Sequence, residues 1–235
     1  MILESYSYSC AGKFHTELNM PNEDCVVILK KEDLAVSVIT DGAGGMNAGK
    51  EAAELIAPTL AEWIYTNFEE LYYRNGDFVR GEAVWIISSC LKAYAQSHGY
   101  EESDLACTLM AAGIDAEGRC ICLHLGDGVI LRRMTRDDIN RAEIVSPPEN
   151  GLISQETYLT MNCNMWKHIR YCRWKDPETE CIISLTDGAQ THIAKLDNAE
   201  GWAITSSCPF DSEKIINYLL HQQPVDDHSF TIISK

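Results

Sequence analysis

The chain has 235 residues, of which 35 are Asp or Glu and 19 are Lys or Arg, so its formal net charge is −16. This charge argues against nucleic-acid binding, because phosphate backbones are held by clustered Lys and Arg. Hydrophobic residues make up 46% and charged residues 23%, which excludes a disordered or low-complexity chain. The length supports one full core, and we expect a single domain over residues 1–235.

The N-terminus and the cysteines indicate the compartment. The chain contains no apolar run of the ~20 residues that a membrane span needs, and MILESYSYSC lacks the pattern of a signal peptide. The ten cysteines are scattered and form neither CxxC nor a zinc spacing. We therefore expect a cytoplasmic protein with no membrane contact, in which most cysteines are buried thiols.

The first part of the chain predicts strands and then two helices. Residues 4–9, 25–30 and 34–40 have β patterns, and the last two form a hairpin. A glycine-rich loop follows at residues 41–45, and a helical pattern continues to about Tyr73. We expect a kink or a restart at Pro58, and a second helix over residues 79–97.

The second part predicts strands joined by tight turns. Strands at 105–114, 119–125 and 129–134 are expected to be antiparallel neighbours, since parallel connections need a longer crossover. Residues 135–160 carry little pattern. Alternation at 166–174, short strands at 181–186 and 229–234, and a helix at 211–222 complete the chain. These elements predict an α+β fold in layers, with antiparallel sheets.

Aspartates stand at the ends of the predicted strands. Asp24 precedes one strand of the first hairpin and Asp41 follows its partner, so both fall on one rim. Asp187 follows a strand, Asp226 precedes the last strand, and Asp127 lies in a turn. Clustered carboxylates repel one another and need cations. Oxygen ligands without His or Cys suit Mg²⁺ or Mn²⁺, and two such ions can activate water for attack on a phosphoryl group.

Five motifs in chain order carry a family resemblance. They are Asn22-Glu23-Asp24, Asp41-Gly42-Ala43-Gly44-Gly45, Leu125-Gly126-Asp127-Gly128, Leu185-Thr186-Asp187-Gly188 and Asp226-Asp227-His228-Ser229. Together they resemble the metal-dependent type 2C (PPM) protein serine/threonine phosphatases. The stretches 12–15 and 150–160, the second of which holds Gln155-Glu156-Thr157, are most similar to a bacterial branch of that family.

The resemblance implies a four-layer α-β-β-α sandwich with two central antiparallel sheets. It also implies hydrolysis of phosphoserine or phosphothreonine in proteins by a metal-activated water, with Mg²⁺ or Mn²⁺ and no phosphoenzyme. Asp41 would bridge two ions, with Asp24, Asp41 and Asp187 catalytic through the bound water. The ligand set carried over is Asp41, Asp187 and Asp226 for the first ion, Asp41, the Gly42 carbonyl, Glu23 and Asp24 for the second ion and its waters, and Asp127 for a third, weaker ion.

Three departures from the family pattern concern the substrate and the third ion. No Arg stands between His15 and Pro21 to bind the substrate phosphate, and we expect His15 to contribute to that contact. Ala43 occupies the place where some members carry a His that protonates the leaving group. Thr191 stands where the partner of the third ion is expected.

Two other functions share some of these sequence features. Residues 44–50 fit the P-loop pattern GxxxxGK, but Glu51 replaces the required Ser or Thr, and the predicted antiparallel strands conflict with a P-loop fold. A catalytically weak or inactive regulatory protein with a phosphatase fold remains the alternative. The missing Arg and His favour it, and the intact acids argue against it.

Overall fold

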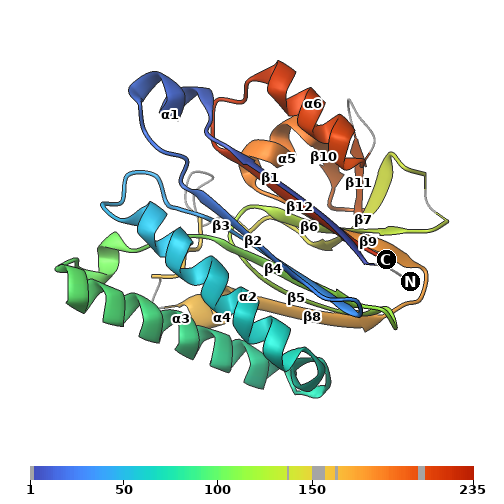
Figure 1. The fold of residues 1–235 in the computed structure, drawn as a ribbon, viewed down its shortest axis with the longest axis horizontal. Coiled ribbons are helices and arrows are strands. Elements are labelled where there is room, and N and C mark those ends of the chain that lie inside the picture. The colour runs from blue at the N-terminus through green and yellow to red at the C-terminus, as the bar shows by residue number, and fades with distance from the viewer. Residues whose placement is uncertain (1–2, 137, 150–156, 162–163, 206–209) are drawn as a thin grey trace.

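The computed structural model describes residues 3–136, 138–149, 157–161, 164–205 and 210–235. Two antiparallel sheets lie face to face in Figure 1, with helices on the outer face of each. The first sheet has the order β2-β3-β4-β5-β8, and the second has the order β1-β12-β9-β6-β7-β11-β10. The predicted α+β class with four layers, α-β-β-α, is confirmed.

The strands of the five-stranded sheet are mostly those that the sequence predicts. Their bounds are β2 (Asp24–Lys30), β3 (Leu34–Asp41), β4 (Leu109–Asp115), β5 (Arg119–Leu125) and β8 (Arg170–Lys175). The strand predicted from residue 166 begins only at Arg170, because residues 165–168 form the short helix α4 (Met165–His168).

The seven-stranded sheet contains more elements that the sequence did not reveal. Its strands are β1 (Glu4–Cys10), β6 (Val129–Met134), β7 (Arg141–Ser146), β9 (Thr179–Leu185), β10 (Ala194–Asp197), β11 (Trp202–Thr205) and β12 (His228–Ser234). The prediction missed β7, β10 and β11, which are four to six residues long. β1 pairs with β12, which places the two ends of the described chain side by side.

One topological prediction was wrong. β6 does not pair with β5 but with β7 and β9 in the other sheet, so the chain crosses between the sheets at residues 126–128. The close approach at Gly128 allows this crossing, since a Cβ there would lie 2.5 Å from Met110 Sδ and 2.8 Å from the Leu185 carbonyl oxygen. A short turn therefore connects two facing sheets, not two neighbouring strands.

The described part of the chain contains seven helices, one of them a 3₁₀ helix. They are α1 (Lys13–Leu18), α2 (Gly49–Tyr73), α3 (Gly76–His98), the 3₁₀ helix η1 (Glu102–Asp104), α4, α5 (Asp187–Ile193) and α6 (Ser212–Gln222). α2 and α3 cover the five-stranded sheet, and α5 and α6 cover the other (Figure 1). α2 continues without a break through the exposed Pro58, so the predicted restart does not occur, and the alternative of a kink stays a prediction.

Three apolar clusters hold the four layers together. One joins α2 and α3 to the five-stranded sheet, and Ile56, Leu60 and Ile64 of α2 lie in it. A second joins α5 and α6 to the seven-stranded sheet. The third fills the space between the sheets and includes Met110 and Ile182. No helix in the described part of the chain is long and apolar enough to cross a bilayer.

Candidate metal centre

The hairpin of β2 and β3 places two predicted acids opposite each other. Asp24 and Asp41 are direct cross-strand partners at the end of the hairpin. Asp41 donates its backbone N–H to Thr108 Oγ1 at 3.0 Å, which ties this rim to the start of β4. The register predicted from the sequence therefore brings the two carboxylates to one rim of the five-stranded sheet.

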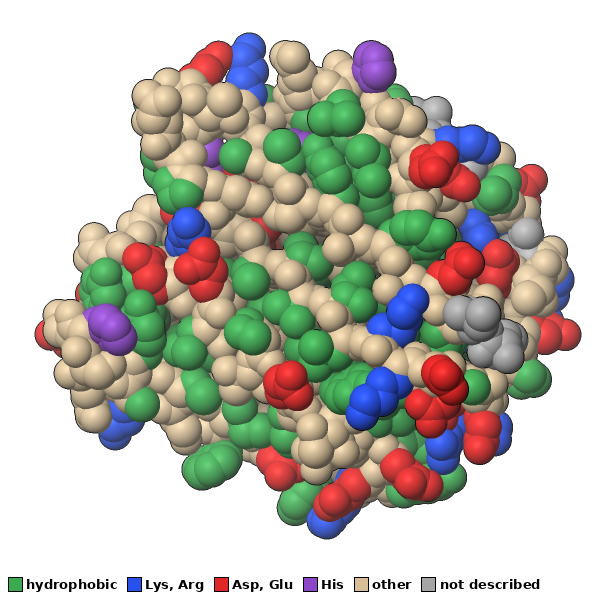
Figure 2. Space-filling model, in the orientation of Figure 1, with side chains coloured by type: hydrophobic (Ala, Val, Ile, Leu, Met, Phe, Trp, Pro, Cys, Tyr) green, Lys and Arg blue, Asp and Glu red, His purple; other side chains and the backbone are tan. Residues whose placement is uncertain are grey.

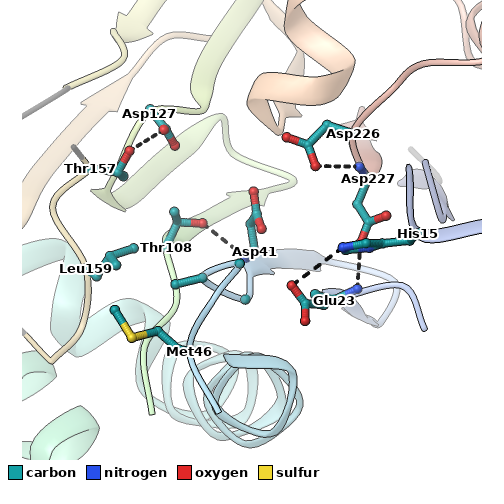
Figure 3. Close-up of a pocket in the computed structure, with 13 residues that line it drawn as sticks. His15, Glu23, Asp41, Met46, Thr108, Asp127, Thr157, Leu159, Asp226 and Asp227 are labelled. Atoms are coloured by element: carbon teal, nitrogen blue, oxygen red, sulfur yellow. Dashed lines mark hydrogen bonds and ion pairs between the residues drawn. The ribbon is translucent and has the colours of Figure 1, made fainter. Parts of the chain in front are cut away.

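The facing sheet supplies the other acids. Asp187 begins α5 directly after β9, and Asp226 precedes β12, the neighbour of β9. Asp127 lies at the crossing between the sheets, and its Oδ2 accepts a hydrogen bond from the Thr157 hydroxyl. Figure 3 shows Asp41, Asp127 and Asp226 around the same space, each from a different segment of the chain.

A cavity of about 530 Å³ lies between these segments. Carboxylates dominate its polar lining, and no Lys or Arg is among the described residues that line it. The lining consists of His15, Glu23, Asp41, Gly42, Ala43, Gly44, Met46, Thr108, Asp127, Thr157, Leu159, Asp226 and Asp227. Asp24 and Asp187 do not line the cavity but lie close enough to influence the acids that do.

The electrostatics show that the acids form one cluster. Burial first, and then the charges of Asp227, Asp187 and Asp226, raise the pKa of Asp24 to about 8, although the Ser229 hydroxyl acts in the opposite direction. Burial and the neighbouring Asp24 raise the pKa of Asp41 well above its ordinary value. Burial, followed by Asp127 and Asp226, raises the pKa of Asp187 to about 6. Each shift reflects the cost of placing negative charges together in a poorly solvated site.

The carboxylate of Asp24 indicates whether the site suits cations. Asp24 is 8% exposed, and both of its carboxylate oxygens are buried with no well-formed hydrogen bond to a described residue, since the nearby Ser229 hydroxyl donates to Ser9 Oγ at 2.8 Å. Such a buried acceptor is costly unless a cation or a donor meets it. The described His, Cys, Asp and Glu side chains do not stand in a ready coordination shell of three or more. The unpartnered oxygens and the purely acidic surroundings nevertheless fit hard divalent cations.

Asp227 is the site residue that the sequence reasoning missed. This carboxylate is 3% exposed and accepts hydrogen bonds from Gly12 N at 2.8 Å and from Glu23 N at 2.7 Å. It also binds His15 Nδ1 at 2.8 Å. Because a carboxylate only accepts, Nδ1 carries the proton, and Nε2 of His15 lies 4.0 Å from Glu23 Oε2. The signal for it in the sequence is the adjacent pair of acids Asp226-Asp227 just before the last strand.

The remaining predicted positions divide into two groups. Glu23 and Gly42 reach the cavity, and Gly42 N donates to the Glu23 carbonyl at 3.1 Å. Burial raises the pKa of the Glu23 carboxyl, while His15 acts in the opposite direction. Ala43 lines the cavity, whereas the Thr191 hydroxyl donates to the Gly188 carbonyl and is not part of the lining. Gln155 and Glu156 lie outside the described residues, and only Thr157 of that motif is described.

The same fold occurs in several solved structures, bacterial phosphatases among them. A bacterial serine phosphatase is 15% identical, with a TM-score of 0.70, and the match covers 99% of this chain and 97% of that one. The serine/threonine phosphatase Stp1 from Staphylococcus aureus is 13% identical, with a TM-score of 0.65 and coverages of 100% and 96%. RsbX in complex with magnesium is 12% identical, with a TM-score of 0.60 and coverages of 99% and 94%. These likenesses establish the class of fold.

The family follows from the sequence. The model of the protein phosphatase 2C family matches residues 11–219, which is most of the chain. No curated protein matches the sequence significantly. The chain belongs to the protein phosphatase 2C family, whose members are protein serine/threonine phosphatases, and the resemblance seen in the five motifs is confirmed.

Proposed function

We propose that this phosphatase hydrolyses phosphoserine and phosphothreonine in proteins with the help of two divalent cations, Mg²⁺ or Mn²⁺. The observation that carries the proposal is the unpartnered carboxylate of Asp24 beside Asp41, at the edge of a cavity lined by further acids. Repulsion and desolvation destabilise such a cluster of carboxylates when no cations are bound, and its oxygen atoms suit hard divalent cations. The magnesium complex of the structural neighbour RsbX agrees with this choice of ion.

The proposed ligands come from both sheets. Bound cations would supply an activated water and would withdraw charge from the phosphoryl group. The chain's own part is to fix the ligands, and the cross-strand pairing of Asp24 with Asp41 does so for the centre of the site. The proposed holders are Asp41 for both ions, Asp187 and Asp226 for the first, Gly42 through its carbonyl with Glu23 and Asp24 for the second, and Asp127 for a weaker third ion.

His15 is proposed to contact the substrate phosphate, and Asp227 is proposed to position it. The imidazole lines the cavity, and its Nδ1 is fixed by the buried carboxylate of Asp227. The described lining contains no guanidinium that could do this instead. In this arrangement Asp227 acts through His15 and through the Glu23 backbone, and does not itself touch the substrate.

The proposal also covers the substrate, the cellular location and the binding partners of the protein. A phosphorylated protein is the substrate, and the single domain over residues 1–235, the cytoplasmic location and the lack of nucleic-acid or membrane partners remain expectations from the sequence. On the face shown in Figure 2, the basic side chains lie beside acidic ones. This mixture agrees with the expectation that the protein does not bind a phosphate backbone.

A phosphate-release assay tests the function. The full chain is incubated with phosphoserine and phosphothreonine peptides, with Mn²⁺, with Mg²⁺ and with a chelator, and is compared with Asp187→Asn. We expect cation-dependent release by the wild type and a loss of at least about 100-fold in the variant, because a charged ligand disappears. Release that a chelator leaves unchanged would contradict the proposal.

A regulatory protein with a phosphatase fold is the second candidate. Ala43 in the cavity lining, and the absence of Lys or Arg from the described lining, favour it. Calorimetry separates the two candidates: Mn²⁺ binding together with no phosphate release from any peptide would favour the regulator.

A further inference from the structure

Two cysteines stand directly opposite each other on neighbouring strands. Cys122 of β5 and Cys172 of β8 are cross-strand partners. Opposed Cα atoms in an antiparallel pair are about 4.5 or 5.5 Å apart, within the roughly 4.4–6.8 Å that a disulfide spans. The two thiols lie close enough that hydrogen bonding between them influences the pKa of both. A covalent link between them would therefore require little movement of the backbone.

No other pair of described cysteines is opposed in this way. Cys120 lies two residues before Cys122 on the same face of β5, but its partners across the ladder are Ile114 and Trp174. Cys181 of β9 faces Arg133 and Ser234. Cys120 is therefore a matched control, because it has the same strand, the same face and similar burial but no thiol opposite.

The two thiols differ in access and in ionisation. Cys122 is 1% exposed, whereas Cys172 is half-buried on the outermost strand of the five-stranded sheet. The hydrogen bond from Cys122, and then the Arg170 guanidinium, lower the pKa of Cys172 to about 7, although burial opposes them. The hydrogen bond and burial raise the pKa of Cys122. Cys172 is thus the more reactive thiolate, and Cys122 is placed to resolve its oxidised form.

We propose that Cys122 and Cys172 form a redox modification site that hydrogen peroxide converts to a reversible disulfide. The Cys172 thiolate attacks one peroxide oxygen, the O–O bond breaks, and hydroxide leaves, so Cys172 becomes a sulfenic acid. The sulfur of Cys122 then attacks the sulfur of Cys172, the S–O bond breaks, and water leaves with the proton of Cys122. Two thiols are oxidised, and the peroxide is reduced to water.

The disulfide would join the edge strand β8 covalently to its neighbour β5. β8 is held by β5 on one side only, and it carries Arg170, which donates to the Pro147 carbonyl at 2.6 Å. A disulfide would close a loop of about 50 residues and would restrict the unfolded chain more than the folded one. We therefore expect the oxidised protein to melt at a higher temperature than the reduced protein.

Mass spectrometry of the intact chain tests the site. The reduced protein is treated with a small excess of hydrogen peroxide, and one portion is measured intact while another is alkylated and digested. We expect a mass lower by two hydrogen atoms, a linked peptide pair containing Cys122 and Cys172, reversal by dithiothreitol, and a melting temperature a few degrees higher. A disulfide between another pair, or oxidation of Cys172 without a link, would overturn the proposal.

Three variants sharpen the result. Cys120→Ser should form the link as the wild type does. Cys122→Ser should stop at the sulfenic acid of Cys172, which dimedone traps. Cys172→Ser lies on the edge strand, where folding is least at risk, and should show no link and no dimedone adduct on Cys122. A linked product in either of the last two variants would contradict the assignment.

Discussion

Asp227 joins three separate segments of the chain through one carboxylate. It accepts hydrogen bonds from Gly12 N and Glu23 N. It also binds His15 Nδ1, which lies beside it in Figure 3. Oδ1 meets one N–H donor and Oδ2 meets two. In Asp227→Asn, an amide NH₂ group at either position would therefore face another donor. Asp227, the neighbour of the proposed metal ligand Asp226, thus holds the His15 ring and the Glu23 backbone in place.

Asp227→Asn tests this positioning role. We expect kcat/KM to fall by about 10-fold to 100-fold, as for other residues that orient a functional group, while the affinity for Mn²⁺ changes only slightly. Steady-state kinetics on a phosphopeptide and calorimetry with Mn²⁺ give the two values. Unchanged kinetics, or an equal loss of Mn²⁺ affinity, would show that Asp227 has another role.

Two glycines of the same loop provide a matched pair. A Cβ at Gly42 would lie 2.7 Å from the backbone carbonyl of Gly49, whereas a Cβ at Gly44 would meet nothing closer than Glu23 Oε2 at 3.9 Å. We expect Gly42→Ala to cost about 1–3 kcal/mol of stability and to weaken cation binding. Gly44→Ala should change both by little. Denaturant unfolding with and without Mn²⁺ checks this, and equal effects of the two changes would contradict the loop geometry.

Asp24 and Asp115 are both buried aspartates at strand ends, but their surroundings differ. Asp115 accepts bonds from Glu117 N, from Arg119 N and from Arg119 Nε. We expect Asp24→Asn to stabilise the cation-free protein by roughly 1–3 kcal/mol, because it removes a carboxyl that must either carry an uncompensated charge or take up a proton on folding, and to reduce the stabilisation by Mn²⁺. Asp115→Asn should be destabilising with or without Mn²⁺. Thermal unfolding distinguishes them, and a destabilised Asp24→Asn would count against the site.

Among the elements, β5 carries a buried histidine that links stability to pH. His124 Nδ1 lies 2.9 Å from Ser146 Oγ and 3.0 Å from an Arg170 nitrogen. Burial, and then the charge of Arg170, hold the pKa of His124 well below its ordinary value. Below about pH 6.5 the His124 imidazole therefore becomes protonated in the unfolded chain but stays neutral in the folded chain.

The free energy of unfolding should accordingly fall as the pH drops below about 6.5, by at most roughly 1.4 kcal/mol per pH unit from this group. In His124→Gln, the free energy of unfolding should lose this part of its dependence on pH. In the control His98→Gln, at an exposed position, it should keep that dependence. Urea unfolding between pH 7 and pH 5 measures the difference. Identical slopes in wild type and His124→Gln would contradict this account.

The elements also show which parts of the fold could be read from the sequence. The hairpin of β2 and β3 was predictable, because alternation and a short turn fix its register locally, and with it the pairing of Asp24 with Asp41. The partner of β6 was not predictable, because a short turn can join facing sheets as well as neighbouring strands. β10 and β11 were missed because each is four residues long, too short for a period to emerge.

For the molecule as a whole, the acid cluster explains part of the net charge of −16. The convergence of acids from both sheets was predictable from their strand-end positions and from the family resemblance. The contacts of Asp227 with the His15 ring and with Glu23 N were not, because these hydrogen bonds join segments more than 200 residues apart. Whether the cluster holds cations is the claim on which the proposed reaction depends.

The most direct test is the anomalous scattering of manganese in crystals of the full chain soaked in Mn²⁺. We predict anomalous peaks inside the cavity lined by Glu23, Asp41 and Asp226, and their loss in crystals of Asp41→Asn. Crystals that hold Mn²⁺ only at other acidic side chains, or not at all, would contradict the account.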